Sequence, residues 1–185
     1  FSADMSLLTV IFLCRLPFNP TCTFAITRLW SDEMTAPWYV LQFHNAVFHL
    51  CSIKIKSIIT VIQVYAPTAE SSEEEIEEFY EKLEDTIAEV PRKDIKVVMG
   101  DWNAKVGSDN EGWEAAMGRY GYGEQNERGE RLLEFAVKHK LMIGNTRFQQ
   151  KESRKWTWRS PSGLRKNMID LILIEQRWKT ALLNC

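Results

Sequence analysis

The sequence predicts an α/β sandwich with mixed sheets. Strand and helix patterns alternate along the chain, and several strand pairs are joined by short turns, which favours mixed rather than purely parallel pairing. The 185 residues are 45% hydrophobic and 26% charged, with a formal net charge of -2. These values are typical of globular proteins and exclude collagen-like, mucin-like and wholly disordered chains. The length suits one domain with a sizeable core.

The first 37 residues mix apolar pieces with three prolines and show no clean period. We leave residues 1–37 unassigned and place the domain at residues 38–185. Residues 38–66 are predicted to be strands: Ile53 and Ile55 alternate with lysines, and 58–64 is a β-branched run that Pro67 ends.

Residues 71–90 give the clearest helix. Six apolar residues fall on one stripe at helical spacing: Ile76, Phe79, Tyr80, Leu83, Ile87 and Val90. Ser72 and Glu75 form a capping box, and Pro91 stops the helix. The acidic residues of this segment are therefore expected on an outer helix face and not in a metal site.

The remaining elements are shorter. We expect a strand at 95–99, a loop at 107–127, a helix at 128–140, strands at 141–146 and 155–160, a turn at 161–163 and a strand at 168–174.

Charge is distributed unevenly. Residues 70–89 hold ten acidic residues and one base, whereas residues 147–179 hold nine bases, three acids, Trp156 and Trp158. Bases interleaved with aromatic residues suit a polyanion that offers stackable bases. The alternative, which charge alone favours, is a solvated basic face over core tryptophans.

The sequence does not support a membrane-spanning, zinc-binding or disulfide-rich protein. No stretch approaches the about 18 apolar residues of a membrane-spanning helix. Cys14, Cys22, Cys51 and Cys185 lack metal-ligand spacing, so we predict reduced thiols in an intracellular protein.

Asp101 is the first candidate for chemistry. It follows a short apolar strand and Gly100, and Asn103 can point to the same side two residues on. A carboxylate with an amide can orient a water and hydrogen-bond phosphate oxygens. The alternative is a turn in which both side chains satisfy their own backbone.

Two further polar residues lie in strands. Asp170 interrupts an apolar run, so its carboxylate needs a hydrogen bond, a cation or a metal, and a structural ion pair is the alternative to a catalytic role. Tyr65 ends the 58–64 run and is either a site residue or an ordinary half-buried tyrosine.

Taken together and in order, these blocks make a specific pattern. They are 61–67 (Val-Ile-Gln-Val-Tyr-Ala-Pro), 100–103 (Gly-Asp-Trp-Asn), Asn126-x-x-Gly129-x-x-Leu132, Thr157-Trp158 and Ile169-Asp170. The sequence resembles the endonuclease/exonuclease/phosphatase superfamily, and more closely the endonuclease domains of LINE-type retrotransposons.

The resemblance implies a four-layered, DNase I-like α/β sandwich and a phosphodiesterase that uses Mg²⁺, or Mn²⁺ in its place, on nucleic acid, with DNA favoured. Asp101 would orient or deprotonate the attacking water, and Asn103 and Tyr65 would lie beside the phosphate. Asp170 would fix and polarise a catalytic histidine.

The resemblance also implies an interface. Thr157 and Trp158 would line the DNA-facing rim, and Asn126 would support the site or contact substrate. We expect no membrane and predict no protein partner. Nuclear localisation is implied by the resemblance alone.

Three blocks of the superfamily are not recognisable: an asparagine in the first strand, a Gln-Glu block with the metal-binding glutamate, and a Ser-Asp-His block after Asp170. Asn19 and Glu33 match by type but not by context, so the metal ligands stay unknown. We therefore expect a domain incomplete at both ends, with low or no nuclease activity. The alternatives are a non-catalytic remnant that binds nucleic acid weakly and a small-molecule phosphoesterase.

Overall fold

The computed structural model describes residues 9–12, 24–27, 38–43, 46–54 and 58–184, with side-chain burial for 59–184. The chain forms two compact units, Phe1–Thr35 and Ala36–Cys185. In the first, β1 (Thr9–Phe12) pairs antiparallel with β2 (Phe24–Thr27). The second carries the predicted domain. Cys14, Cys22 and Cys185, predicted to be reduced thiols, and the predicted strand residues 55–57 lie outside the described residues.

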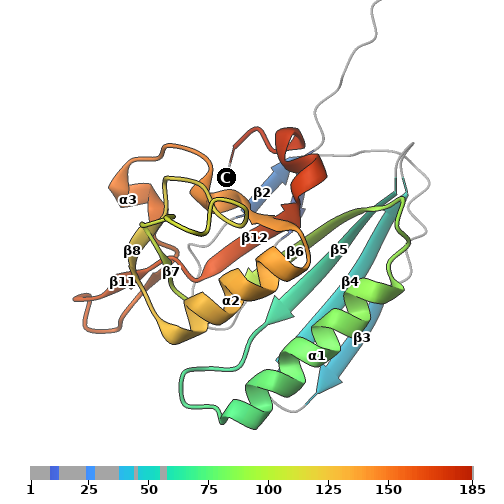
Figure 1. Ribbon diagram of the computed structural model, residues 1–185, viewed down its shortest axis with the longest axis horizontal. Helices are drawn as coiled ribbons and strands as arrows, with labels where there is room; N and C mark the ends of the chain where they lie inside the picture. Colours follow the sequence, from blue (N-terminus) through green and yellow to red (C-terminus); the bar gives the residue numbers. More distant parts are fainter. Residues whose placement is uncertain (1–8, 13–23, 28–37, 44–45, 55–57, 185) are drawn as a thin grey trace, which may run out of the picture. The chain divides into compact units, whose positions relative to one another are not determined.

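A six-stranded mixed sheet organises the second unit (Figure 1). Its order is β3 (Trp38–Phe43), β4 (Ala46–Lys54), β5 (Ile58–Tyr65), β6 (Ile95–Asp101), β12 (Asp170–Glu175) and β9 (Leu141–Ile143). β5 and β6 run parallel, and the other neighbours run antiparallel. A parallel pair needs a long crossover, which α1 (Glu73–Glu89) supplies. The predicted α/β class with a mixed sheet is confirmed.

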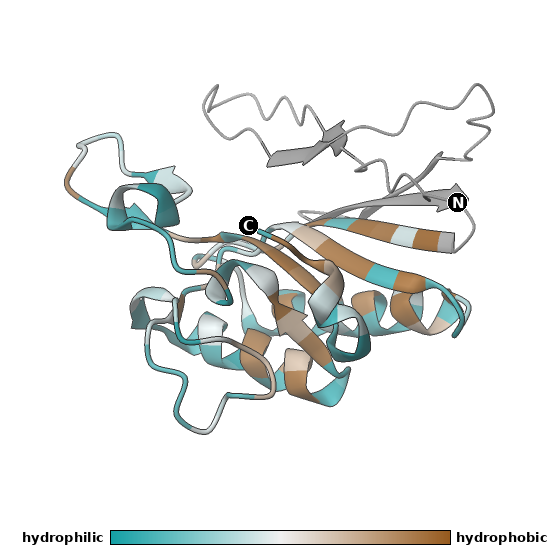
Figure 2. Ribbon diagram, turned by 90° about the horizontal axis from the view of Figure 1, so that it is seen from above, coloured by the Kyte–Doolittle hydropathy of each residue, from teal (hydrophilic) through white to brown (hydrophobic). Residues whose placement is uncertain are grey.

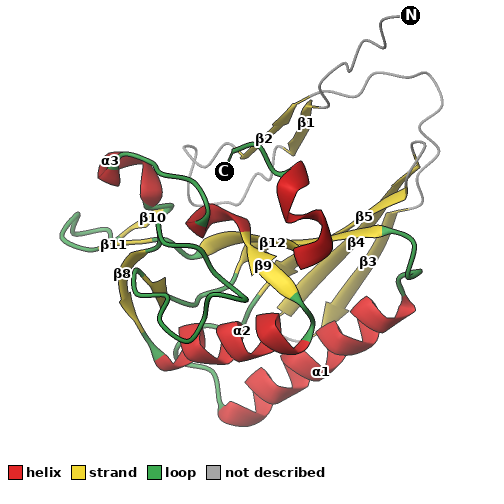
Figure 3. Cartoon of the chain, turned by 45° about the horizontal axis from the view of Figure 1, so that its top comes forward, coloured by secondary structure: helices red, strands yellow, loops and turns green. Residues whose placement is uncertain are grey.

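Two helices cover one face of this sheet. α1 and α2 (Glu127–Lys138) lie side by side (Figure 3), joined by Arg131–Glu77 at 2.9 Å and Lys138–Glu84 at 2.7 Å. The strands beneath are mostly hydrophobic (Figure 2). The core between sheet and helices includes Ile62, Val64, Val98, Leu171 and Leu173 from the strands and Phe79, Leu83, Leu132, Leu133 and Phe135 from the helices.

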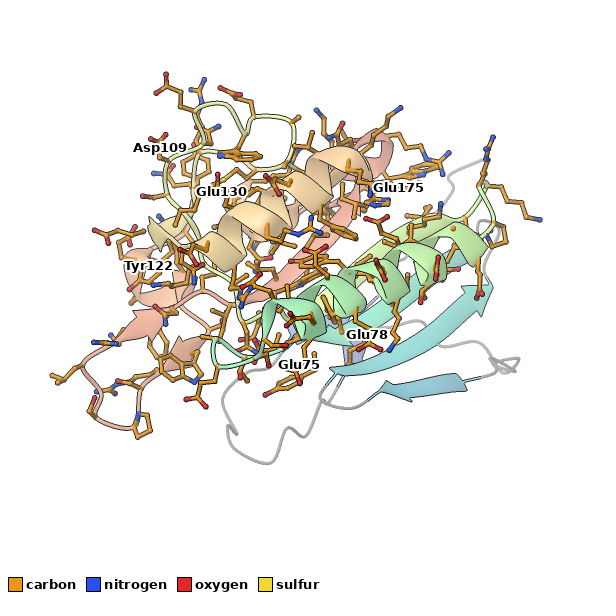
Figure 4. The ribbon with its side chains drawn as sticks, turned by 60° about the horizontal axis from the view of Figure 1, so that its bottom comes forward. Glu75, Glu78, Asp109, Tyr122, Glu130 and Glu175 are labelled. Carbon is orange, nitrogen blue, oxygen red and sulfur yellow. The ribbon has the colours of Figure 1, made fainter. Side chains whose placement is uncertain are left out.

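The predicted helix at 71–90 is confirmed in its caps and its faces. The Glu75 amide donates to Ser72 Oγ at 3.2 Å, and the Ser72 amide donates to Glu75 Oε2 at 3.0 Å. All six residues of the apolar stripe are buried. Glu75 and Glu78 project from α1 away from the sheet (Figure 4), so the acidic run is an outer face as expected.

Several short elements differ from the expected ones. The strand expected at 141–146 stops at Ile143 and continues as the 3₁₀ helix η1 (Gly144–Thr146). The strand expected at 155–160 is only β10 (Trp158–Arg159), preceded by α3 (Glu152–Lys155) and paired with β11 (Lys166–Asn167). The expected loop contains β7 (Val106–Gly107) and β8 (Tyr122–Gln125), and η2 (Gln176–Ala181) follows β12. Elements of two to four residues are too short to show a hydrophobic period.

Gly100 lets β6 approach β5 closely. Its φ is 148°, in the region that favours glycine, and a Cβ at this position would lie 1.9 Å from the Val64 carbonyl oxygen. The residue before Asp101 must therefore be glycine if β5 and β6 are to pair up to that point.

We expect Gly100→Ala to lower the free energy of unfolding by about 3 kcal/mol or more, because a backbone clash adds to left-handed strain. Gly112→Ala is the matched control: its φ is 79°, but nothing lies within 4 Å of the added Cβ. Urea unfolding followed by circular dichroism measures both. Equal losses in the two variants would contradict the close approach.

Candidate active site

Tyr65, Asp101 and Asp170 lie in one row across three neighbouring strands. Tyr65 of β5 is in register with Asp101 of β6, and Asp101 is in register with Asp170 of β12. Residues paired in this way project from the same face of a sheet, with Cβ atoms roughly 5 Å apart in an antiparallel pair. This face is opposite to that of the neighbouring row of Val64, Gly100 and Leu171, in which Val64 and Leu171 belong to the helix-side core. The sheet thus gathers three polar groups at one end.

The turn after β6 brings Asn103 to the same place. The Asn103 amide donates to Asp101 Oδ1 at 2.9 Å, and Asn103 Nδ2 donates to the Ala66 carbonyl at 2.8 Å. Asn103 has φ of 47°, a left-handed conformation that non-glycine residues adopt uncommonly and that is concentrated at functional sites. The side chain is therefore held between β6 and the segment after Tyr65.

Asp170 is held by Thr157. The Thr157 hydroxyl accepts from the amides of Ile169 and Asp170, each at 3.1 Å. Burial raises the pKa of Asp170, and the hydrogen bond from Thr157 works in the opposite direction. The structure places the Thr157 hydroxyl against the Asp170 backbone, where it fixes the start of β12. Sequence reasoning assigned Thr157 only to a DNA-facing rim.

The pKa of Asp101 is raised as well. Burial raises the pKa of Asp101 to about 6, the Asn103 amide opposes the rise, and the nearby Asp170 adds to it. A carboxyl with pKa about 6 is mostly ionised at pH 7 and can still take a proton, which is the property of a general base.

Asn126 has a supporting position. Its Oδ1 caps α2 by accepting from the Gly129 amide at 2.9 Å, and it also accepts from the Lys105 amide at 2.9 Å. The contact fixes the chain four residues beyond Asp101. Contact of Asn126 with substrate stays a prediction.

Asn145 is a residue that sequence reasoning missed. It lies in η1 beside the first residues of β12. An asparagine just after a strand is more often part of a turn, so its residue type carried little signal.

Five exposed bases gather near the β10–β11 hairpin. This basic hairpin surface consists of Lys151, Arg154, Arg159, Arg165 and Lys166. The Lys166 ammonium lies 4.8 Å from the centre of the Trp156 ring, and Trp156 and Trp158 are half-buried. The bases therefore face solvent around partly covered tryptophans. This arrangement fits both a nucleic-acid-binding surface and a solvated basic face over core tryptophans.

A divalent cation needs oxygen ligands, and the row supplies two carboxylates. Within residues 59–184, no group of three histidine, cysteine, aspartate or glutamate side chains gathers in a way that could hold a metal ion. The described side chains do not by themselves form a metal site. In the same residues, no helix is long and apolar enough to cross a membrane.

The fold and this row define a mixed α/β domain with polar side chains gathered at one end of its sheet. A model of the family described as "Endonuclease-reverse transcriptase" matches residues 59–182. The chain belongs to this family, and its predicted membership of the endonuclease/exonuclease/phosphatase superfamily is confirmed.

The chain is also similar to craniofacial development protein 2 from two mammals. It is 46% identical to the protein of Bos taurus over 123 residues, which are 66% of this chain and 20% of the relative. It is 44% identical to that of Tragulus javanicus over 154 residues, which are 83% of this chain and 24% of the relative. The chain thus spans about a quarter of the length of these relatives or less.

Two solved structures are more distant. A humanised D. rerio TDP2 has a TM-score of 0.44 at 14% identity, covering 75% of this chain and 50% of the other. A variant of the 3′ phosphatase NExo from Neisseria, bound to a product DNA hairpin, has a TM-score of 0.49 at 17% identity, covering 72% and 53%. Both TM-scores are below 0.5, so the fold assignment depends on the strand order described above.

We expect Asp101→Asn to stabilise the domain at pH 7 by on the order of 2 kcal/mol, because the folded state holds an ionised carboxylate in a half-buried place. The folded pKa of about 6 exceeds the ordinary value of 3.8, so the folded state binds more protons between these values. Wild-type stability should therefore fall as pH rises from about 4 through 6, relative to the variant.

Thermal unfolding of both proteins between pH 4 and 8 measures this difference. The gap in Tm should be small at pH 4 and reach its full size above pH 7. A constant gap would mean that Asp101 titrates normally in the folded protein.

Proposed function

We propose that this chain is a retrotransposon-type DNA endonuclease domain that hydrolyses phosphodiester bonds slowly and requires Mg²⁺, for which Mn²⁺ can substitute. The row formed by Tyr65, Asp101 and Asp170 supports this proposal most strongly. The match to the endonuclease family is consistent with a phosphodiester substrate. A DNA substrate would place the protein in the nucleus.

The proposed chemistry uses the described residues as follows. Asp101 takes a proton from a water as that water attacks the phosphorus, and the bond from phosphorus to the leaving sugar oxygen breaks. The leaving oxygen takes a proton from solvent. The Tyr65 hydroxyl and the second N–H of the Asn103 side-chain amide donate hydrogen bonds to the phosphate oxygens, where negative charge grows.

We expect low activity because no histidine with a described side chain, within residues 59–184, lies beside Asp170. Among the residues with described side chains, His139 is the only histidine. It lies on the helix side of the sheet, with its Nε2 3.3 Å from Glu84 Oε1 and its ring against Phe135. It cannot serve Asp170. Loss of one group that stabilises the transition state typically costs about 10²–10³-fold in rate.

A second candidate function is DNA binding without cleavage. The basic hairpin surface supports it, because exposed lysines and arginines displace counterions from the DNA backbone whether or not catalysis follows. Such binding should weaken steeply with salt.

We expect Mg²⁺-dependent nicking of supercoiled plasmid to fall at least about 100-fold in Asp101→Ala, because the general base is lost. Asp109→Ala, which removes an exposed loop aspartate, is the control and should nick as the wild type does. For the wild type, kcat/KM should rise about tenfold per pH unit below pH 6 and level off above 7, because Asp101 must be ionised to act.

Other outcomes separate the alternatives. Equal nicking by wild type and Asp101→Ala would remove Asp101 from the mechanism. Salt-sensitive DNA binding without nicking would favour the non-catalytic function. Hydrolysis of an inositol phosphate without DNA cleavage would favour a small-molecule phosphoesterase.

A further inference from the structure

The start of β12 has a strand on one side and none on the other. Residues 170–174 pair with β6 along one edge. Along the other edge, β9 pairs only with residues 173–175, because the chain turns away into η1 after Ile143. The main-chain groups of Asp170 and Ile172 on that edge need another partner, since unpaired backbone groups away from water are costly.

The side chain of Asn145 is that partner. Asn145 Nδ2 donates to the Asp170 carbonyl at 3.2 Å, and Asn145 Oδ1 accepts from the Ile172 amide at 2.8 Å. One planar amide thus makes the two bonds that the N–H and the C=O of a single residue in a neighbouring parallel strand would make. Asparagine and glutamine alone combine a donor and an acceptor in such a group, and the shorter asparagine reaches from η1.

The segment that presents Asn145 is itself fixed. Thr146 is fully buried, and its hydroxyl donates to the Ile143 carbonyl and accepts from the Gly118 amide, each at 2.7 Å. The Ile143 amide donates to the Ala116 carbonyl at 2.7 Å. Asn145 therefore extends from a turn whose backbone is held by hydrogen bonds, and its own two bonds attach β12 to that turn.

Asp170 is consequently held from three directions. β6 pairs with it through Asp101, Thr157 accepts from its amide, and Asn145 donates to its carbonyl. Thr157 and Asn145 bond the amide and the carbonyl of Asp170, which lie on the edge of β12 away from β6, and Asn145 also bonds the Ile172 amide.

We propose that Asn145 is a positioning residue that keeps Asp170 in register with Asp101 by acting as the missing strand partner of β12. The inference rests on the proposed function of the row, which it deepens. Asn145 touches the backbone of Asp170 and Ile172 and acts on the reaction only through these two contacts.

The test compares Asn145→Ala and Asn145→Asp with Leu173→Val. Aspartate keeps the acceptor for the Ile172 amide but cannot donate to the Asp170 carbonyl, and because it also adds a negative charge, Asn145→Ala is the neutral comparison. Leu173 is fully buried on the helix side of β12, and its truncation destabilises the same strand without a change at the Asp170 carbonyl.

We expect both Asn145 variants to lower kcat for plasmid nicking about tenfold or more, with KM within about twofold, because a displaced group affects the transition state more than substrate binding. Leu173→Val should keep kcat within about twofold at a temperature where all the variants are folded. An unchanged kcat in Asn145→Ala, or an equal loss in Leu173→Val, would overturn the positioning role.

Amide hydrogen exchange supplies a readout that does not need activity. In Asn145→Ala, exchange at Ile172 and Asp170 should accelerate relative to Ile174, and Leu173→Val should not show this selectivity. If the wild type cleaves no DNA, the proposed function fails and this measurement still decides whether Asn145 anchors Asp170. Unchanged exchange at both amides would overturn the inference.

Discussion

The pairing of β6 with a parallel strand on one side and an antiparallel strand on the other is the constraint on which the site depends. The parallel partner β5 brings Tyr65 to Asp101, and the antiparallel partner β12 brings Asp170 to it. Because side chains alternate between faces, a slip of one residue in either pairing would move a polar group to the helix-covered face. The residues at the strand ends therefore form a site only while both registers hold.

Two local backbone features also hold Asp101 at its place in the row. Gly100 allows the close approach to Val64, and Asn103 turns back through a left-handed conformation to bond Asp101 and Ala66. Burial raises the pKa of both Asp101 and Asp170, so the folded protein keeps carboxyl groups where their ionisation is unfavourable. Carboxyl groups whose pKa is raised, placed beside a left-handed asparagine, are typical of a functional site.

The sequence predicted the structure best where the signal is local, as with a hydrophobic period, a helix cap or a turn residue. The apolar stripe of 71–90, its capping box and the strand before Gly100 are local patterns, and each is found in the structure. The supporting contacts of Thr157 and Asn145 could not be predicted, because they join residues 13 and 25 positions apart through single hydrogen bonds. The short strands β7, β8, β10 and β11 exist through tertiary pairing and have no periodic signal of their own.

A double-mutant cycle between Asp101 and Asp170 tests most directly whether these two carboxylates share one pocket. At pH 7.5, Asp101→Asn and Asp170→Asn should each stabilise the domain. The double variant should gain less than the sum by on the order of 1 kcal/mol, since either substitution alone removes their mutual repulsion. The shortfall should vanish at pH 4, where burial keeps Asp101 protonated. Strict additivity at pH 7.5 would show that the two carboxylates do not interact, and the account of the site would be wrong.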